Sequence, residues 1–210
     1  MYREILSRLP SSVTLLAVSK TKPYEMVESL YAEGQRLFGE NRVQEIETKF
    51  PIPSERPDGM KVFMIGHLQS NKVRKAVALS DRIESVDSLK VLDLIAAEAG
   101  KIGRKIDILL EWKCSEDPEK TGFSDIEELY RAVERARGME SVNLLGLMTV
   151  GPLTDERDEI RRSFHQTRMI FEDIGGLDVL SMGMSGDWEI AIDEGSTEIR
   201  IGTLLFGSRN

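Results

Sequence analysis

The chain has few cysteine and histidine residues, and these shortages exclude several kinds of protein. Cys114 is the single cysteine among 210 residues, so no disulfide can form within the chain. This fits a reducing compartment, and we expect a cytoplasmic protein in which Cys114 is a packed side chain. The two histidines, His67 and His165, lie far apart with no metal-ligand spacing around them. We therefore expect no metal site.

Long apolar runs and an excess of positive charge are also absent. No apolar run approaches the length that spans a membrane, and residues 1–6 are too polar for a signal peptide. The formal net charge is -8, whereas nucleic-acid-binding proteins usually carry a basic face. We therefore expect neither a membrane nor a nucleic acid among the partners of this protein.

The pattern that is present is a strict alternation of strand-like and helix-like segments. The chain is 40% hydrophobic and 30% charged, which supports one globular domain over residues 1–210. Apolar runs predict strands, and apolar stripes at helical spacing predict the helices between them. The expected strands cover residues 13–19, 36–38, 61–65, 82–85, 105–112, 143–150, 179–182 and 198–201. The expected helices cover residues 23–34, 41–50, 70–79, 88–99, 124–137, 155–172 and 187–193, and a capping box from Ser124 to Glu127 opens the fifth of them.

Eight strand–helix units favour an α/β fold, built as a single closed (β/α)8 barrel of the TIM type. The chain length lies at the short end for that fold. An open doubly wound sheet has the same alternation and is the alternative. No G-x-G-x-x-G motif follows the first expected strand, which weakens the dinucleotide-binding version of that alternative.

Lys20 ends the first expected strand and is the main candidate for chemistry. An apolar stretch runs up to this lysine, and Pro23 then begins a helical pattern. A lysine at the mouth of a buried strand loses hydration, which makes its amine easier to deprotonate. A neutral amine there can form a Schiff base with an aldehyde. Taken alone, the pattern more often describes a strand-end lysine whose charged head reaches water.

Two glycine-containing turns follow the last two expected strands. In a (β/α)8 barrel a phosphate site often forms from the loops after strands seven and eight. Glycine lets backbone N–H groups approach a phosphate closely, and neighbouring hydroxyl groups add donors. Either turn alone is better explained as an ordinary turn, but both at these positions favour a phosphate site. The residues are Ser185 and Gly186, beside the start of the helix near Asp187, and Gly202 and Thr203 after strand eight.

Arg200 lies between two isoleucines in the last expected strand. A guanidinium inside a barrel needs a partner, since burying an unpaired charge is costly. One interpretation is a salt bridge to Glu40 or Glu198. The other is a hydrogen bond to the pyridine nitrogen of bound pyridoxal 5′-phosphate (PLP), for which arginine is a known partner. The lysine, the phosphate turns and Arg200 together describe a PLP site, whereas a class I aldolase would share the first two without needing the arginine.

With these motifs in view, the chain resembles the pyridoxal-phosphate homeostasis proteins of the YggS/PROSC type over nearly its whole length. Each matching stretch is weak alone, and together they are highly specific. The stretches are A-V-S-K-T-K-P at 17–23, F-G-E-N-R-V-Q-E at 38–45, I-G-H-L-Q-S-N-K at 65–72, G-L-M-T at 146–149, S-M-G-M-S-G-D at 181–187 and G-S-T-E-I-R-I-G-T at 195–203.

The resemblance implies a single barrel like the N-terminal domain of alanine racemase, with PLP bound covalently. Asn41, judged from the residues alone, is a helix cap. The cofactor-binding residues that the resemblance implies are Lys20 for the Schiff base, Ser185, Gly186, Gly202 and Thr203 for the phosphate, Arg200 for the pyridine nitrogen, and Asn41 and Met182 for the lining of the pocket.

The sequence departs from the family pattern at two strands. Members often have Trp-His before the Ile-Gly of the third strand, where this chain has Val62 and Phe63. After the fifth strand they often have a Gln-Val-Asn-like run, where this chain has Glu-Trp-Lys at 111–113. We expect the details of the pocket near these strands to differ. Members usually carry a longer N-terminal helix, so residues 1–9 are interpreted as a shortened version.

These features favour a non-catalytic protein that holds PLP reversibly in vitamin B6 homeostasis or passes it to PLP-dependent apo-enzymes, and we expect a monomer. Arginine does not give up its proton, so it would leave the pyridine nitrogen unprotonated and the ring a weak electron sink. The alternatives are a slow PLP-dependent amino-acid racemase and a Schiff-base aldolase. The related racemases need a tyrosine from a second domain, which we do not expect here, and the tyrosines of this chain fall at the N-terminus or in expected helices: Tyr2, Tyr24, Tyr31 and Tyr130.

Overall fold

The computed structural model describes residues 1–115 and 117–207, and its strands form a closed barrel. The eight strands are parallel and pair in sequence order. The ring closes where β8 (Glu198–Ile201) pairs with β1 (Thr14–Val18). The predicted (β/α)8 barrel is therefore confirmed, and the open doubly wound sheet is excluded. The expected domain span of 1–210 includes residues 116 and 208–210, which lie outside the described residues.

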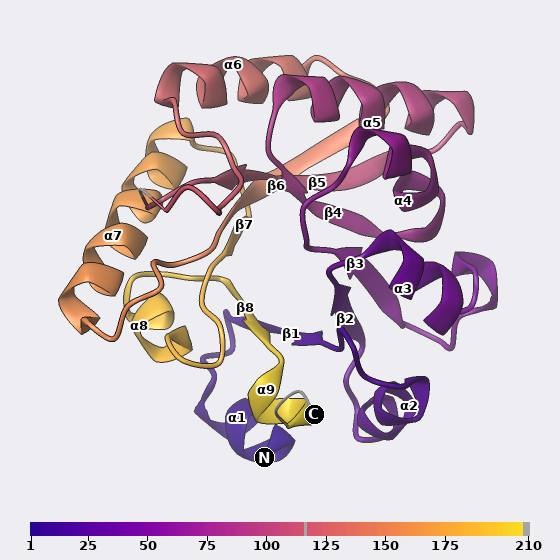
Figure 1. Ribbon diagram of the computed structural model, residues 1–210, viewed down its shortest axis with the longest axis vertical. Coiled ribbons are helices and arrows are strands. Elements are labelled where there is room, and N and C mark those ends of the chain that lie inside the picture. Colours follow the sequence, from indigo (N-terminus) through magenta and orange to yellow (C-terminus); the bar gives the residue numbers. More distant parts are fainter. Residues whose placement is uncertain (116, 208–210) are drawn as a thin grey trace.

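Helices alternate with the strands along the chain and surround the ring (Figure 1). Among the described residues, no helix is long and apolar enough to cross a membrane. The remaining strands are β2 (Leu37–Glu40), β3 (Lys61–Met64), β4 (Arg82–Val86), β5 (Ile106–Trp112), β6 (Val142–Thr149) and β7 (Val179–Ser181). The helices are α1 (Tyr2–Arg8), α2 (Tyr24–Ala32), α3 (Val43–Lys49), α4 (Val73–Leu79), α5 (Leu89–Lys101), α6 (Ile126–Arg137), α7 (Arg157–Ile174), α8 (Trp188–Asp193) and α9 (Thr203–Phe206), with 3₁₀ turns η1 (Pro53–Glu55) and η2 (Ser70–Lys72).

The observed elements follow the predicted ones, with corrections at the starts of three helices. Asn41 does not cap α3, because the N-cap residue is Arg42, whose side chain makes no capping hydrogen bond. The helix expected at 70–79 begins as a 3₁₀ turn and becomes α-helical only at Val73. The capping box at Ser124 is wrong, because α6 begins after Asp125, whose side chain accepts a hydrogen bond from the backbone N–H of Glu127. Aspartate is as good an N-cap as serine, so the helix keeps its cap although a neighbouring residue provides it.

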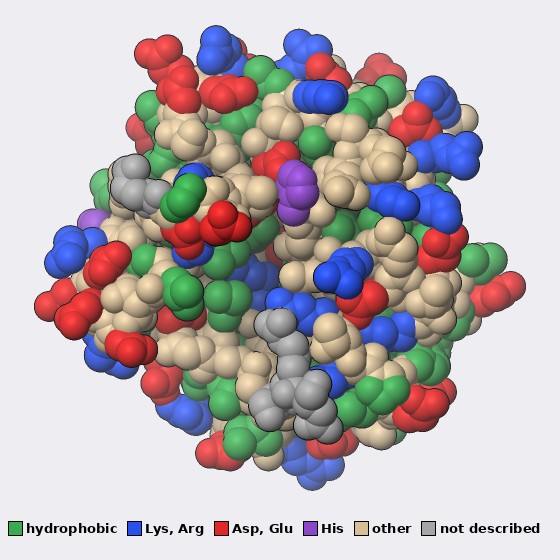
Figure 2. All heavy atoms as spheres, in the orientation of Figure 1, with side chains coloured by type: hydrophobic (Ala, Val, Ile, Leu, Met, Phe, Trp, Pro, Cys, Tyr) green, Lys and Arg blue, Asp and Glu red, His purple; other side chains and the backbone are tan. Residues whose placement is uncertain are grey.

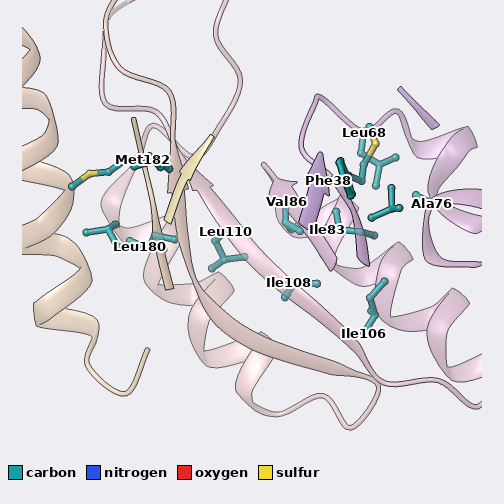
Figure 3. Close-up of a cluster of buried hydrophobic side chains, with 14 of the residues drawn as sticks. Phe38, Leu68, Ala76, Ile83, Val86, Ile106, Ile108, Leu110, Leu180 and Met182 are labelled. Atoms are coloured by element: carbon teal, nitrogen blue, oxygen red, sulfur yellow. The ribbon is translucent and has the colours of Figure 1, made fainter. Parts of the chain in front are cut away.

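The main hydrophobic core lies between the ring of strands and the helices. Side chains alternate across a strand, so every second residue of β5 points the same way. Ile106, Ile108 and Leu110 are buried and belong to one apolar cluster with residues of the helices. Figure 3 shows these side chains along β5, with Leu180 and Met182 from the β7 region in the same cluster. The outward faces of the strands therefore carry the packing that holds the barrel and the helices together.

The inside of the ring, near the N-terminal ends of the strands, is instead charged. Arg82 is 6% exposed and lies over the ring of Phe63 at 4.0 Å. Its guanidinium donates to Oε1 of Glu84 at 2.6 Å and also pairs with Oε2 of Glu198. Burial, followed by the charge of Glu84, raises the pKa of Glu198. One buried guanidinium thus holds two buried carboxyl groups, which belong to β4 and β8.

We predict that Arg82→Met lowers the free energy of unfolding by about 3–5 kcal/mol, because it leaves Glu84 and Glu198 buried without their cation. Urea unfolding followed by circular dichroism measures the change. The control is Arg74→Met in α4, where an exposed arginine is lost and the change should stay below about 0.5 kcal/mol. Equal stability of Arg82→Met and the unchanged protein would contradict this account of the barrel interior.

Candidate functional site

Lys20 lies just beyond the end of β1, at the mouth of the barrel. It belongs to a turn that is closed by a hydrogen bond of 3.0 Å from the backbone N–H of Lys22 to the carbonyl oxygen of Ser19. Lys20 is half-buried in this turn. The C-terminal ends of the strands form the functional face of (β/α)8 barrels. The lysine therefore lies at the strand end that the apolar pattern predicted.

The residue after the lysine, Thr21, has an uncommon backbone conformation. Its φ of 64° lies in the left-handed region, which a β-branched residue rarely adopts. Such strain costs on the order of 1–3 kcal/mol and persists only where the surrounding structure imposes it. The backbone N–H of Thr21 donates to Oε2 of Glu45 in α3 at 2.6 Å. This hydrogen bond holds the direction in which the chain leaves Lys20.

A buried network supports the other side of the same turn. Nζ of Lys49 in α3 donates to the carbonyl oxygen of Ser19 at 2.8 Å and to Oε1 of Glu40 at 2.7 Å. The hydroxyl of Ser19 donates to the same carboxylate oxygen at 2.6 Å. Burial raises the pKa of Glu40 to about 7, although the hydrogen bonds from Lys49 and Ser19 lower it. Because the folded protein holds this proton more tightly, the contribution of Glu40 to stability is present below about pH 4.5 and is lost as the pH rises towards 7.

Arg200 in β8 is buried and hydrogen-bonded inside the barrel. Its Nη1 donates to the carbonyl and hydroxyl oxygens of Ser181 at 2.7 and 2.8 Å, and its Nη2 donates to the carbonyl oxygen of Thr149 at 2.6 Å. Within the described residues neither of the two salt bridges considered from the sequence is formed. The hydroxyl of Ser181 in turn donates to Oε2 of Glu84 at 3.0 Å. These bonds account for three of the five donors of the guanidinium and fix its orientation.

The two glycine turns lie side by side at the mouth. The backbone N–H of Leu204 in α9 donates a hydrogen bond of 3.5 Å to Oγ of Ser185. Gly186 is exposed, and a Cβ there would meet nothing within 4 Å. A Cβ on Gly202 would lie 3.2 Å from the carbonyl oxygen of Val18 in β1. The first turn is therefore open, whereas the second is packed against the strand that leads to the candidate lysine.

The remaining predicted site residues differ in how deeply they are buried. Thr203 is exposed at the start of α9. Asn41 is half-buried and lines a cavity of about 580 Å³ together with residues of the loop after β3, such as His67. Met182 is fully buried in the outer hydrophobic core, and its neighbour Ser181 is the residue that faces the inside of the barrel. Met182 can therefore line the mouth only through its backbone.

The departure from the family pattern at β3 affects packing more than the mouth. Val62 is buried in the outer core, and Phe63 covers Arg82 inside the ring. The departure at β5 is different, because Glu111 is buried near Arg200. Burial raises the pKa of Glu111 to about 7, although the charge of Arg200 opposes this rise. The expected difference at β5 therefore concerns a buried acid close to a predicted site residue.

Hollows occur on both sides of the strand ends. A hollow of about 1220 Å³ lies outside the barrel between the loop after β5, α6 and α7, and none of the predicted site residues lines it. Figure 2 shows a second hollow near the middle of the face seen in Figure 1, with acidic and basic side chains around it. No group of three or more His, Cys, Asp or Glu side chains that could hold a metal ion occurs within residues 1–115 and 117–207.

The groups gathered at the mouth fit a phosphorylated aldehyde with a basic ring nitrogen. Lys20 supplies a primary amine, which is the group that condenses with an aldehyde. The turns at Ser185 and Gly202 supply backbone N–H groups and hydroxyls, and the open space at Gly186 leaves room for a phosphate. Arg200 supplies a fixed cationic donor. This is the donor set that PLP requires.

Fold and site together define a barrel of the alanine racemase N-terminal-domain class. The sequence model of the family described as "Alanine racemase, N-terminal domain" matches residues 2–210. An alanine racemase from Clostridium difficile has the same fold, with a TM-score of 0.78 at 16% identity over 99% of this chain and 55% of that one. At this identity the likeness concerns the fold alone.

Relatives with higher sequence identity show which family within this class the chain belongs to. The "Pyridoxal phosphate homeostasis protein" of Synechocystis sp. is 38% identical over 217 residues, which cover 100% of this chain and 97% of the relative. That of Pseudomonas aeruginosa is 38% identical over 204 residues, which cover 97% and 87%. The structure of PipY from Synechococcus elongatus with PLP bound has a TM-score of 0.90 at 39% identity and covers 98% of both chains. The chain therefore belongs to the pyridoxal phosphate homeostasis protein family, and the resemblance predicted from its motifs is confirmed.

The residues that hold the lysine turn were not predicted from the sequence. Glu45 and Lys49 lie four residues apart on α3 and reach the turn from outside the barrel. Glu45 ends one of the matching stretches, 38–45, but no role was assigned to it. The signal that could have found both residues is their spacing, because residues i and i+4 share one face of a helix.

We predict that Glu45→Ala loosens the turn that carries Lys20, because the N–H of Thr21 loses its acceptor. Hydrogen exchange of the Thr21 amide, followed by NMR, should become faster by about tenfold or more. Glu47→Ala is the matched control, since it removes an exposed ion pair with Lys75 from the same helix and should leave that exchange rate unchanged. Unchanged exchange in Glu45→Ala would show that other contacts hold the turn.

Proposed function

We propose that this protein binds PLP without catalysis, as a Schiff base on Lys20, and so takes part in the control of intracellular PLP, or vitamin B6. The observations that carry this proposal lie at the C-terminal ends of the strands: a strand-end lysine, two glycine turns of which the one at Gly186 is open, and a buried arginine held by Ser181. The PLP bound to PipY and the names of the relatives support it.

Each predicted residue has a role in this proposal. PLP supplies an aldehyde that condenses with an amine, and the chain supplies the amine and the groups that orient the cofactor. The proposed PLP-binding residues are Lys20 for the Schiff base, Ser185, Gly186, Gly202 and Thr203 for the phosphate, Arg200 for the pyridine nitrogen, Asn41 for the wall of the pocket and Met182 through its backbone.

The buried arginine supports a binding role over a catalytic one. Arginine remains charged in proteins, so it cannot pass a proton to the ring nitrogen. The hydrogen bonds to Ser181 and Thr149 hold its guanidinium in one orientation. A ring whose nitrogen stays unprotonated withdraws electrons weakly, which favours holding PLP over reactions at an amino acid. We extend the proposal to a cytoplasmic monomer that passes PLP to apo-enzymes.

We predict that Lys20→Ala abolishes the visible absorbance band of the Schiff base on adding PLP, while the circular dichroism spectrum of the fold stays unchanged. Borohydride reduction followed by peptide mapping should label Lys20 alone. Lys22→Ala, which removes the other lysine of the same turn, should keep both the band and the labelled site. A reduced adduct on Lys22 or Lys72 in the unchanged protein would overturn the assignment.

We predict that Gly186→Val weakens the binding of PLP by about tenfold or more, because the new side chain occupies the space proposed for the phosphate. Its Cβ has no neighbour within 4 Å, so the melting temperature should not change. Pyridoxal, which lacks the phosphate, is the matched ligand, and its affinity should be equal in both proteins. A parallel loss of affinity for pyridoxal would mean that the turn acts on the ring and not on the phosphate. Gly202 is less suited to this test, since a Cβ there presses on β1.

A further inference from the structure

Glu111 is a buried acid near the mouth that the proposed function has not used. It lies near the C-terminal end of β5 and is 5% exposed. Its neighbours Leu110 and Trp112 belong to the outer core, so by the alternation of a strand the side chain of Glu111 faces the inside of the barrel. One carboxyl oxygen, Oε1, accepts a hydrogen bond of 2.9 Å from the hydroxyl of Thr121.

The other oxygen, Oε2, is buried and has no hydrogen-bond partner within the described residues. A buried polar atom without a partner costs about 1–3 kcal/mol, so Oε2 is stabilised by any water, ion or ligand group that reaches it. The group at this position is a carboxyl, which can carry a proton of its own. A glutamine would offer an N–H donor in place of an acidic oxygen.

Charged groups from several elements surround this carboxyl. Asp87, which follows β4, raises its pKa, whereas Arg200 of β8 and His67 of the loop after β3 lower it. His67 is itself paired with Asp87, with Nδ1 and Oδ2 2.7 Å apart. Burial is the largest influence and raises the pKa of Glu111 to about 7. Near neutral pH the carboxyl is therefore partly protonated, and its protonated form has an O–H group to donate.

The geometry decides which kind of ligand atom meets Oε2. Oε1 is already the acceptor of the Thr121 hydroxyl, so a proton on the carboxyl belongs on Oε2. That O–H needs an acceptor, and none exists within the described residues. Of the acceptor oxygens that PLP offers, the phosphate is proposed at the turns after β7 and β8, on other strands of the ring. The oxygen on the pyridine ring is the acceptor that remains for a residue of β5.

We propose that Glu111 is a further cofactor-binding residue, whose protonated carboxyl donates a hydrogen bond from Oε2 to the ring oxygen of bound PLP. This inference rests on the proposed function. In the empty protein part of the Glu111 population is ionised, and that part takes one proton from solvent when PLP binds. The affinity for PLP is thereby linked to pH through this residue.

The test is calorimetric titration of the full chain with PLP at pH 6 and pH 8, each in two buffers with different heats of ionisation. Glu111→Gln keeps the size of the side chain and removes the titrating proton. At pH 8 the unchanged protein should take up about 0.9 proton more than Glu111→Gln, and at pH 6 about 0.1 more. The ratio of its affinity to that of Glu111→Gln should fall about tenfold from pH 6 to pH 8. Protons from PLP and Lys20 contribute equally to both proteins.

The control is Asp107→Asn, which changes an inward acid near the other end of β5, where it accepts a hydrogen bond from Asn143. It should bind with the proton uptake of the unchanged protein. Equal proton uptake by the unchanged protein and Glu111→Gln, with a constant ratio of affinities, would overturn the inference. Absence of any binding heat in the unchanged protein would instead overturn the proposed function.

A second measurement needs no variant and covers the case in which Glu111→Gln fails to fold. The infrared difference spectrum of the unchanged protein at pH 8, with PLP minus without, should gain the C=O band of a protonated carboxylic acid. The same spectrum at pH 6 should show little gain, because the carboxyl is already protonated there. No gain of this band at pH 8 would overturn the inference.

Discussion

Two guanidinium groups buried inside one narrow barrel impose the strongest constraint on this structure. A buried arginine keeps its charge, so acceptors must surround it. Arg82 is met by two carboxyl groups, one of them Glu84, and Arg200 is met by Ser181 and a carbonyl oxygen. Ser181 joins the two groups, because its hydroxyl accepts from Arg200 and donates to Glu84. The orientation of the arginine nearer the mouth is therefore tied to the balance of charge deeper in the ring.

The turn that carries Lys20 is held from outside the barrel. Its supports come from α3, on the outside of the barrel, and contact the backbone of the turn through Glu45 and Lys49. The strained φ of Thr21 shows that this turn is not the conformation the local sequence prefers. The turn that carries Lys20 is thus held by hydrogen bonds from a helix outside the barrel, whereas Arg200 is held by hydrogen bonds inside it.

The fold was predictable because its signals are local. Apolar runs mark strands wherever they occur, and eight of them in alternation with helices leave few architectures. Lys20 and the two glycine turns were located for the same reason, since a strand end is visible in the sequence. The partners of Arg200 were not, because nothing near residue 200 indicates that Ser181 and Thr149 will meet it in place of a glutamate. The direction of Met182 was hidden as well, since it depends on which alternate residues face inward.

Neighbouring residues along each strand belong to different surroundings. Ser181 takes part in the hydrogen bonds of the interior, and Met182 packs against the helices. A substitution at one position therefore changes mainly the contacts on its own side of the strand, since successive side chains point to opposite faces. Substitutions of the inward-facing polar residues and of the outward-facing apolar residues can therefore accumulate independently in evolution. Substitutions in the polar interior leave the outer hydrophobic core intact. Such a barrel can therefore evolve new ligand specificities and keep its stability.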